Sequence, residues 1–406
     1  MGTPQTPYDA VLHAARDVAK LDNALDAEML GAALLGSVYS VAETERDAAV
    51  RDFVAGFLAA TSRRRSAAAT TIRSVFAALV PDAEGAGRVR PGAATPAWAA
   101  QLGRVHLTGC WSYGDVYGDQ TSYLATFAYD DPAGGSAHAV VTLLDHNIGI
   151  TKDVFVGGPP DRILDQVRQM CSGDELTWFR DEEPARMRAE VTRHLAITDG
   201  LTELPGEGSL ATDRALLGAR LALLPRAAGA APAPAEPLSA AERTDLVRRF
   251  LASPEAARFG LDAIDGAELA SLHFCLSLLL DHAASFPDAD PMRWSPTVAG
   301  LFLLDWVHRR AVLDMDDAAL LPRVLRAWAG YAARKRGLPE QAAAQTDTAI
   351  EEMVPEFARL YSTGERRSPA TAAVAQLMAD GVDPDDPAAL NAWIEANRHR
   401  LTDDPA

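Results

Sequence analysis

A β-rich segment inside an otherwise helical pattern most constrains what this 406-residue chain can fold into. Four runs between residues 105 and 156 are rich in β-branched and aromatic residues and are bounded by glycine and aspartate: Val105–Ser112, Tyr123–Tyr129, Ala137–Leu144 and Ile150–Val156. Because the connections between the runs are short, they predict an antiparallel meander, since parallel strands need long crossovers. The nearly all-apolar run from Ala139 to Leu144 is typical of a central strand that is covered on both faces.

Helical patterns flank this segment on both sides. Apolar residues recur at three- and four-residue spacing from residue 8 to about residue 80. After the β-rich segment, prolines open two further helices, over Asp161–Cys171 and from Pro184 to about Thr198. The predicted fold class is therefore α+β, with a helical N-terminal segment, a small antiparallel sheet with covering helices, and a separate all-α C-terminal domain.

Two proline-rich stretches divide the chain into its predicted parts. The first stretch, residues 81–97, ends the predicted helical N-terminal segment, residues 1–97. The predicted α+β module, residues 98–225, follows it. Residues 226–238 (RAAGAAPAPAEPL) read as a Pro/Ala linker before the all-α domain, residues 239–406. In that domain, Ser239, Ser295 and Ser368 are predicted helix caps, and Pro355 is expected to kink or divide a long helix.

Charge and cysteine content limit the class of protein. The chain has 56 acidic and 38 basic residues and a formal net charge of −18, whereas nucleic-acid binders are typically basic. The three cysteines, Cys110, Cys171 and Cys275, are far apart, which argues against a disulfide framework and for a reducing compartment. The N-terminus lacks the apolar core of a signal peptide, and no apolar run approaches the length of a membrane span. We therefore expect a soluble, cytoplasmic protein with no membrane partner.

The densest group of polar residues follows the strands of the β-rich segment. A tandem Tyr-Gly-Asp repeat comes after the first strand, and an Asp-His hairpin with a lysine beyond its turn comes later. Carboxylate oxygens and an imidazole nitrogen are suitable ligands for a divalent cation, the only cofactor that the sequence indicates. The candidate metal ligands are Asp115, Asp119, Asp145, His146 and Asp153.

The same segment holds the two candidate catalytic residues. His146 could act as a general base, and Lys152 stands out because it is the only lysine between positions 20 and 335. The alternative is structural, because aspartate and asparagine near glycine are turn residues and an Asp–Lys pair beside a strand end is a common salt bridge.

The only basic cluster lies in the N-terminal segment. It consists of Arg63, Arg64 and Arg65, with Arg73 further along the next predicted helix. Such a cluster could contact the phosphates of a nucleic acid, although charge runs at helix starts are usually solvated faces.

The motifs of the β-rich segment also carry a family resemblance. The run from Asp115 to Gln120 (DVYGDQ), followed by Asp145-His146-Asn147-Ile148-Gly149 and Lys152-Asp153, resembles a family of uncharacterised actinobacterial proteins with a Tyr-Gly-Asp-Gln loop and an Asp-His hairpin. The run Arg293-Trp294-Ser295-Pro296 is similar to their appended C-terminal helical module. The resemblance implies this architecture and a cytoplasmic bacterial setting, and it implies no activity.

Three functional hypotheses follow. The sequence contains no P-loop, no H-E-x-x-H and no G-x-S-x-G motif, so the leading hypothesis is a non-catalytic cytoplasmic binding or scaffold protein with a protein partner. One alternative is a metal-assisted hydrolase that uses the acidic and histidine cluster of the central module. A second alternative is a regulator that contacts nucleic acid through the N-terminal arginines.

Overall fold

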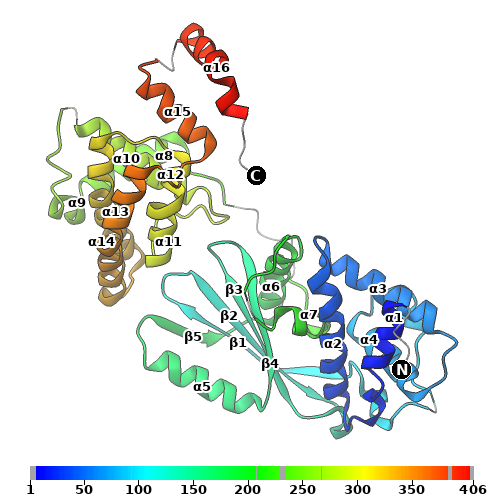
Figure 1. Cartoon of the computed structure of the whole chain (residues 1–406). Coiled ribbons are helices and arrows are strands. Elements are labelled where there is room, and N and C mark those ends of the chain that lie inside the picture. The colour runs from blue at the N-terminus through cyan, green and yellow to red at the C-terminus, as the bar shows by residue number, and fades with distance from the viewer. Residues whose placement is uncertain are drawn as a thin grey trace. The chain divides into compact units, whose positions relative to one another are not determined.

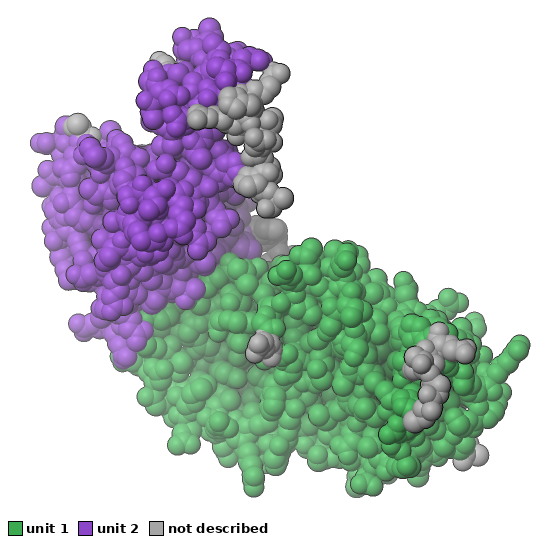
Figure 2. Space-filling view, viewed as in Figure 1, with its two compact units in different colours: residues 1–232 green, residues 233–406 purple. Residues whose placement is uncertain are grey.

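The chain divides into two compact units, residues 1–232 and 233–406 (Figure 2). The computed structural model describes residues 6–92, 94–206, 208–227, 235–266, 268–382 and 386–402. The boundary between the units falls within the predicted linker, of which residues 228–234 lie outside the described residues. The α+β fold class is confirmed, with a sheet and its covering helices in the first unit and a helical second unit.

The first unit is built on a five-stranded antiparallel sheet with the strand order β4-β3-β2-β1-β5 (Figure 1). The strands are β1 (Val105–Asp115), β2 (Gln120–Tyr129), β3 (His138–Asp145), β4 (Ile150–Gly157) and β5 (Thr177–Asp181). The four predicted runs form the meander from β1 to β4. The fifth strand, β5, is not predicted from the sequence, and it pairs with β1 after a helical excursion. Five residues that end in Arg180 and Asp181 are too few and too polar to give a clear strand pattern.

The described part of the first unit also contains seven α-helices. They are α1 (Pro7–Ala14), α2 (Ala24–Val41), α3 (Arg46–Thr61), α4 (Ala67–Leu79), α5 (Pro160–Ser172), α6 (Pro184–Asp199) and α7 (Leu210–Leu223). Both helices that the sequence predicts after the sheet are confirmed as α5 and α6.

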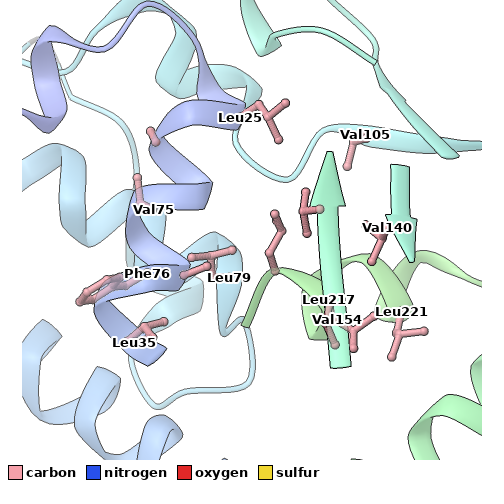
Figure 3. Close-up of a cluster of buried hydrophobic side chains, with 14 of the residues drawn as sticks. Leu25, Leu35, Val75, Phe76, Leu79, Val105, Val140, Val154, Leu217 and Leu221 are labelled. Carbon is pink, nitrogen blue, oxygen red and sulfur yellow. The ribbon is translucent and has the colours of Figure 1, made fainter. Parts of the chain in front are cut away.

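The two faces of the sheet pack against different helices, because successive residues of a strand point to opposite sides. On one face, Phe127 and Val140 belong to a large core that also contains side chains of α2, α4, α6 and α7. Figure 3 shows part of this core, with Leu35 from α2, Phe76 from α4 and Leu217 from α7 in one cluster. The opposite face buries a smaller cluster against α5, consisting of Leu124, Val167 and Cys171 with Trp111, Tyr113, Val141, Ile163 and Phe179 around them. Strand β3, an interior strand of the sheet, is therefore covered on both faces, as its sequence predicts.

The N-terminal helices and the sheet share one core, although the sequence pattern places a boundary at residue 97. Helix α2 is the clearest case, because Leu25 and Leu35 are buried in the same cluster as Val140 of the sheet. By length and composition α2 is also apolar enough to cross a membrane, but half of that window is buried inside the protein. Its buried apolar residues, among them Leu25 and Leu35, pack in this core, whereas Val41 at its end is exposed.

The second unit is helical in its described part. Its core is formed around two buried tryptophans, Trp294 and Trp328, together with leucines from several helices. The helices are α8 (Ala240–Leu251), α9 (Pro254–Arg258), α10 (Glu268–Ala283), α11 (Pro296–Leu301), α12 (Val307–Arg310), α13 (Met315–Arg336), α14 (Glu340–Thr363), α15 (Pro369–Ala379) and α16 (Pro387–Thr402). A π-helical turn, Phe302–Trp306, joins α11 to α12.

Local signals in this unit are confirmed with one exception. Ser239 forms a capping box with Glu242, and the side chains of Ser295 and Ser368 accept hydrogen bonds from the first turns of their helices. Of the two outcomes expected at Pro355, a kink or a division, the division is wrong, because α14 continues through the proline without interruption. Ile350 and Phe357, on either side of the proline, are both buried in the core, and this packing compensates for the hydrogen bond that proline cannot donate.

Candidate functional site

The predicted acidic loop is a compact pair of linked turns. Asp115 lies at the end of β1, where its two carboxylate oxygens accept the backbone N–H groups of Asp119 at 3.1 Å and Gln120 at 2.7 Å. Gly118 between them has φ of 81°, a conformation that residues with a Cβ rarely adopt. The carbonyl of Asp119 then accepts the N–H of His146 at 2.8 Å, so the β1–β2 turn is tied to the β3–β4 turn.

Two of the other predicted carboxylates, Asp145 and Asp153, also bond to the backbone beside them. Asp145 accepts the N–H of Asn147 at 3.0 Å, and its other oxygen lies 3.7 Å from the ammonium group of Lys152. Asp153 accepts the N–H of Val154 at 2.8 Å. These contacts are the ones that the structural alternative predicts for turn aspartates and an Asp–Lys pair.

The five candidate metal ligands do not form a coordinating set. Across the described ranges, to which all five belong, no three His, Cys, Asp or Glu side chains are grouped so that they could hold a metal ion. In the described residues, no group of side chains could therefore hold the metal ion that the hydrolase hypothesis requires.

His146 is instead paired with a second histidine. The rings of His146 and His194 are nearly perpendicular, with centroids 5.2 Å apart, and Nε2 of His146 lies 2.9 Å from the hydroxyl of Thr121. Nδ1 of His194 donates to the carbonyl of Glu190 at 2.8 Å, and burial lowers the pKa of this imidazole. Sequence reasoning missed His194, because it lies on α6, nearly fifty residues after His146, and no local spacing connects the two.

The first unit also contains a cavity that the sequence does not predict. We call it the arginine–aspartate cleft: a cavity of about 370 Å³ lined by side chains of α2, α3, α6 and α7 and by the end of α4. Its charged lining consists of three arginines and three aspartates: Arg51, Arg188, Arg214, Asp47, Asp82 and Asp199.

The polar centre of the arginine–aspartate cleft is rigidly arranged. Arg214 donates to both carboxylate oxygens of Asp199, with Nη2–Oδ2 at 2.7 Å and Nε–Oδ1 at 3.3 Å, a two-point contact that fixes the guanidinium plane. The hydroxyl of Tyr39 donates to the same carboxylate at 2.7 Å, and Arg214 also reaches Asp47 at 3.2 Å. Burial, together with the negative Asp199, raises the pKa of Tyr39, so this hydroxyl stays protonated and remains a donor.

Apolar side chains form the rest of this lining. Leu35, Leu79, Leu195 and Leu221 are buried leucines from α2, α4, α6 and α7. Toward solvent, Arg51 and Asp82 are exposed. Because the contributing residues come from five helices and the segment after α4, and are separated by up to 187 positions, no motif in the sequence could reveal the cleft.

The four arginines of the N-terminal cluster differ in their contacts and in their burial. Arg64 forms an ion pair with Asp9 at 2.8 Å, and Arg65 donates to the carbonyl of Ser62 at 3.0 Å. Arg73 is buried and donates through Nη1 to the carbonyls of Thr61 and Arg64. Arg73 therefore stabilises the connection between α3 and α4, whereas Arg63 is an exposed residue of that connection.

No protein-family model, curated protein or solved structure matches this chain. The resemblance to actinobacterial proteins stays a prediction, and the geometry of these side chains is the basis for a functional assignment.

Proposed function

We propose that the chain is a non-catalytic cytoplasmic binding protein whose arginine–aspartate cleft receives a segment of a partner protein. The observation that carries the proposal is the fixed arrangement of Tyr39, Asp199 and Arg214 in the lining of a solvent-accessible cavity. A site whose polar groups are already held in place loses little conformational entropy when a ligand binds, and affinity improves accordingly.

The composition of the lining supports a protein segment as the ligand. Buried leucines beside exposed charged residues reproduce the arrangement of protein–protein contacts, which have an apolar centre and a polar rim. The equal numbers of arginine and aspartate give the lining no formal net charge, so it does not select a strongly anionic or cationic ligand. A peptide segment that combines apolar side chains with both charge signs fits this lining.

The cellular setting is proposed on chemical grounds. All three cysteines, Cys110, Cys171 and Cys275, are free thiols and buried. Free thiols are typical of the reducing cytoplasm, where disulfides are rare.

The test uses a substitution that fills the cleft from its solvent side. Ala196 of α6 lines the cleft and is exposed, so Ala196→Trp places an indole in the cavity without entering the core. We expect at least about tenfold weaker binding of the native partner, because the indole competes for the space of the partner's anchoring side chain. The measurement is affinity capture from the source cell, followed by titration of the captured partner.

A matched control is available on α3. Ala60 is also exposed but does not line the cleft, so Ala60→Trp should leave partner binding unchanged. If every captured protein binds wild type, Ala196→Trp and Ala60→Trp with the same affinity, the cleft is not the binding site.

A further inference from the structure

A second cavity of the first unit lies between α3, α4 and the loop that follows α4. We call it the basic groove: a hollow of about 660 Å³ whose charged lining residues are Arg73, Arg88, Arg90 and Glu84. One wall is formed by small and apolar residues of α3, including Leu58, and Val89 lines the loop side. The volume is within the range of about 300–1,000 Å³ that is usual for small-molecule sites.

Arg73 is the fixed cation of the basic groove. It is only 8% exposed, and Nη1 is held by the backbone carbonyls of Thr61 and Arg64. Within the described residues, Nε and Nη2 of Arg73 make no hydrogen bond to the protein, although the side chain lines the cavity. A guanidinium that keeps two unused donors in a concave site is well suited to a phosphate, which accepts from both.

Electrostatics favour an anion at this position. Arg88 and Arg90 are exposed side chains from the loop, and they give the groove three positive charges against Glu84 alone. Burial and the nearby Arg65 lower the pKa of Arg73, because both disfavour its charged form. A bound anion would favour the charged form.

We propose that the basic groove binds a small phosphate ester, with the phosphate on Arg73, Arg88 and Arg90 and the remainder of the ligand against Leu58 and Val89. This site is separate from the arginine–aspartate cleft, and the two proposals do not depend on each other. The exposed Arg63 does not line the groove and has no role in the proposed binding.

A small ligand fits better than a nucleic acid for two reasons. Residues 62–90 contain six arginines and two acidic residues, a net charge of +4, so the remaining residues carry −22 and repel a long polyanion. A nucleic acid also needs cations for many successive phosphates, whereas Arg64 next to the groove is neutralised by Asp9.

The experiment is calorimetric titration of the full chain with inorganic pyrophosphate as the probe. The test variant, Arg88→Gln with Arg90→Gln, removes two exposed cations from the groove and leaves Arg73 and the helix packing intact. The control variant, Arg63→Gln with Arg104→Gln, removes the same amount of charge from exposed positions outside the lining. We expect binding to weaken by about tenfold or more in the test variant and by less than about twofold in the control.

Arg73 is tested separately because it also stabilises the α3–α4 connection. Arg73→Lys keeps the charge but loses the planar fork, and we expect weaker pyrophosphate binding in protein whose circular dichroism spectrum is unchanged. If the lysine variant is misfolded, the Arg88 and Arg90 variant still decides the question, because both of those side chains are exposed.

Three results would overturn the proposal. The first is the absence of pyrophosphate binding at millimolar concentrations. The second is an equal loss of binding in the test and control variants, which indicates general electrostatic attraction. The third is a short DNA duplex that binds more tightly than pyrophosphate and displaces it, which identifies a nucleic-acid surface.

Discussion

At the scale of single residues, the buried Arg220 of α7 connects three parts of the first unit. Its Nη2 donates to the carboxylate of Glu28 on α2 and to the hydroxyl of Tyr129 at 3.0 Å, and its Nε donates to Nε2 of His138 at 3.0 Å. Tyr129 donates to Glu28 at 2.7 Å, and the N–H of Gly103 donates to the other carboxylate oxygen at the same distance. The sequence shows a glutamate inside the apolar α2, but it cannot identify a partner 192 residues away.

We expect the contributions of Arg220 and Glu28 to the free energy of unfolding to be strongly coupled. Arg220→Met leaves the Glu28 carboxylate buried without its cation, and we expect it to destabilise the first unit by about 3–5 kcal/mol. The double variant with Glu28→Met removes both charges and should cost clearly less than the sum of the two single changes. Urea unfolding of the four proteins of this cycle measures the coupling, and strictly additive costs would contradict it.

At the scale of elements, short sequence patterns predict those strands, helix starts and caps that depend on neighbouring residues alone. The meander, the proline-started helices and the serine caps are encoded within a few residues, and the structure confirms them. The strand β5 and the unbroken α14 depend on partners distant in sequence, since β5 is held by β1 and Pro355 lies between buried residues. The same limit applies to the candidate sites: the turn contacts of Asp115 are local, whereas Asp199 and Arg214 meet Tyr39 only through the tertiary fold.

The packing of α2 against α7 gives a prediction at this scale. A Cβ at Gly36 of α2 would lie 2.5 Å from the backbone carbonyl oxygen of Ala211, so the helices must separate to accept Gly36→Ala. We expect a loss of about 1–3 kcal/mol in the free energy of unfolding, because backbone cannot move aside as a side chain can. In the control Gly330→Ala on α13, the new Cβ meets only the side chain of Glu255 at 3.6 Å, an ordinary contact, and stability should change little. Thermal unfolding compares the two, and equal effects would show that the α2–α7 contact tolerates the extra carbon.

At the scale of the whole molecule, each unit contains a buried histidine that resists protonation. Burial, and secondarily Arg220, lowers the pKa of His138 in the first unit to about 4. In the second unit, burial and secondarily Arg293 lower the pKa of His282 to about 4. His282 lies among four aromatic rings at centroid distances of 5.0–5.7 Å: Phe286, Trp294, Phe302 and Trp306. Two of these rings, Phe302 and Trp306, lie on the π-helical turn.

The sign of the effect follows from which state binds the proton. An unfolded histidine titrates near 6.5, so between about pH 6.5 and pH 4 the unfolded chain is protonated while folded His282 stays neutral. The contribution of the neutral histidine to the free energy of unfolding is therefore fully present above that range. It is lost as the pH falls through the range, and the loss is roughly 3 kcal/mol for each such histidine. In the first unit, Asp213 acts in the opposite direction, because burial raises its pKa to about 6 and its protonated form is favoured in the folded state. The second unit is therefore the better place to isolate the histidine effect.

His282→Phe tests this in the second unit, because phenylalanine fits an aromatic surrounding and does not titrate. We expect thermal unfolding of the variant to depend less steeply on pH than that of wild type between about pH 6.5 and pH 4, with the difference vanishing above that range. The control is His273→Gln on the same helix, α10, where the side chain is exposed and its replacement should leave the wild-type pH dependence intact. If His282→Phe retains the full acid sensitivity of wild type, the aromatic surrounding does not exclude the proton from the folded state, and the acid response comes from other groups, such as carboxylates or the buried His308.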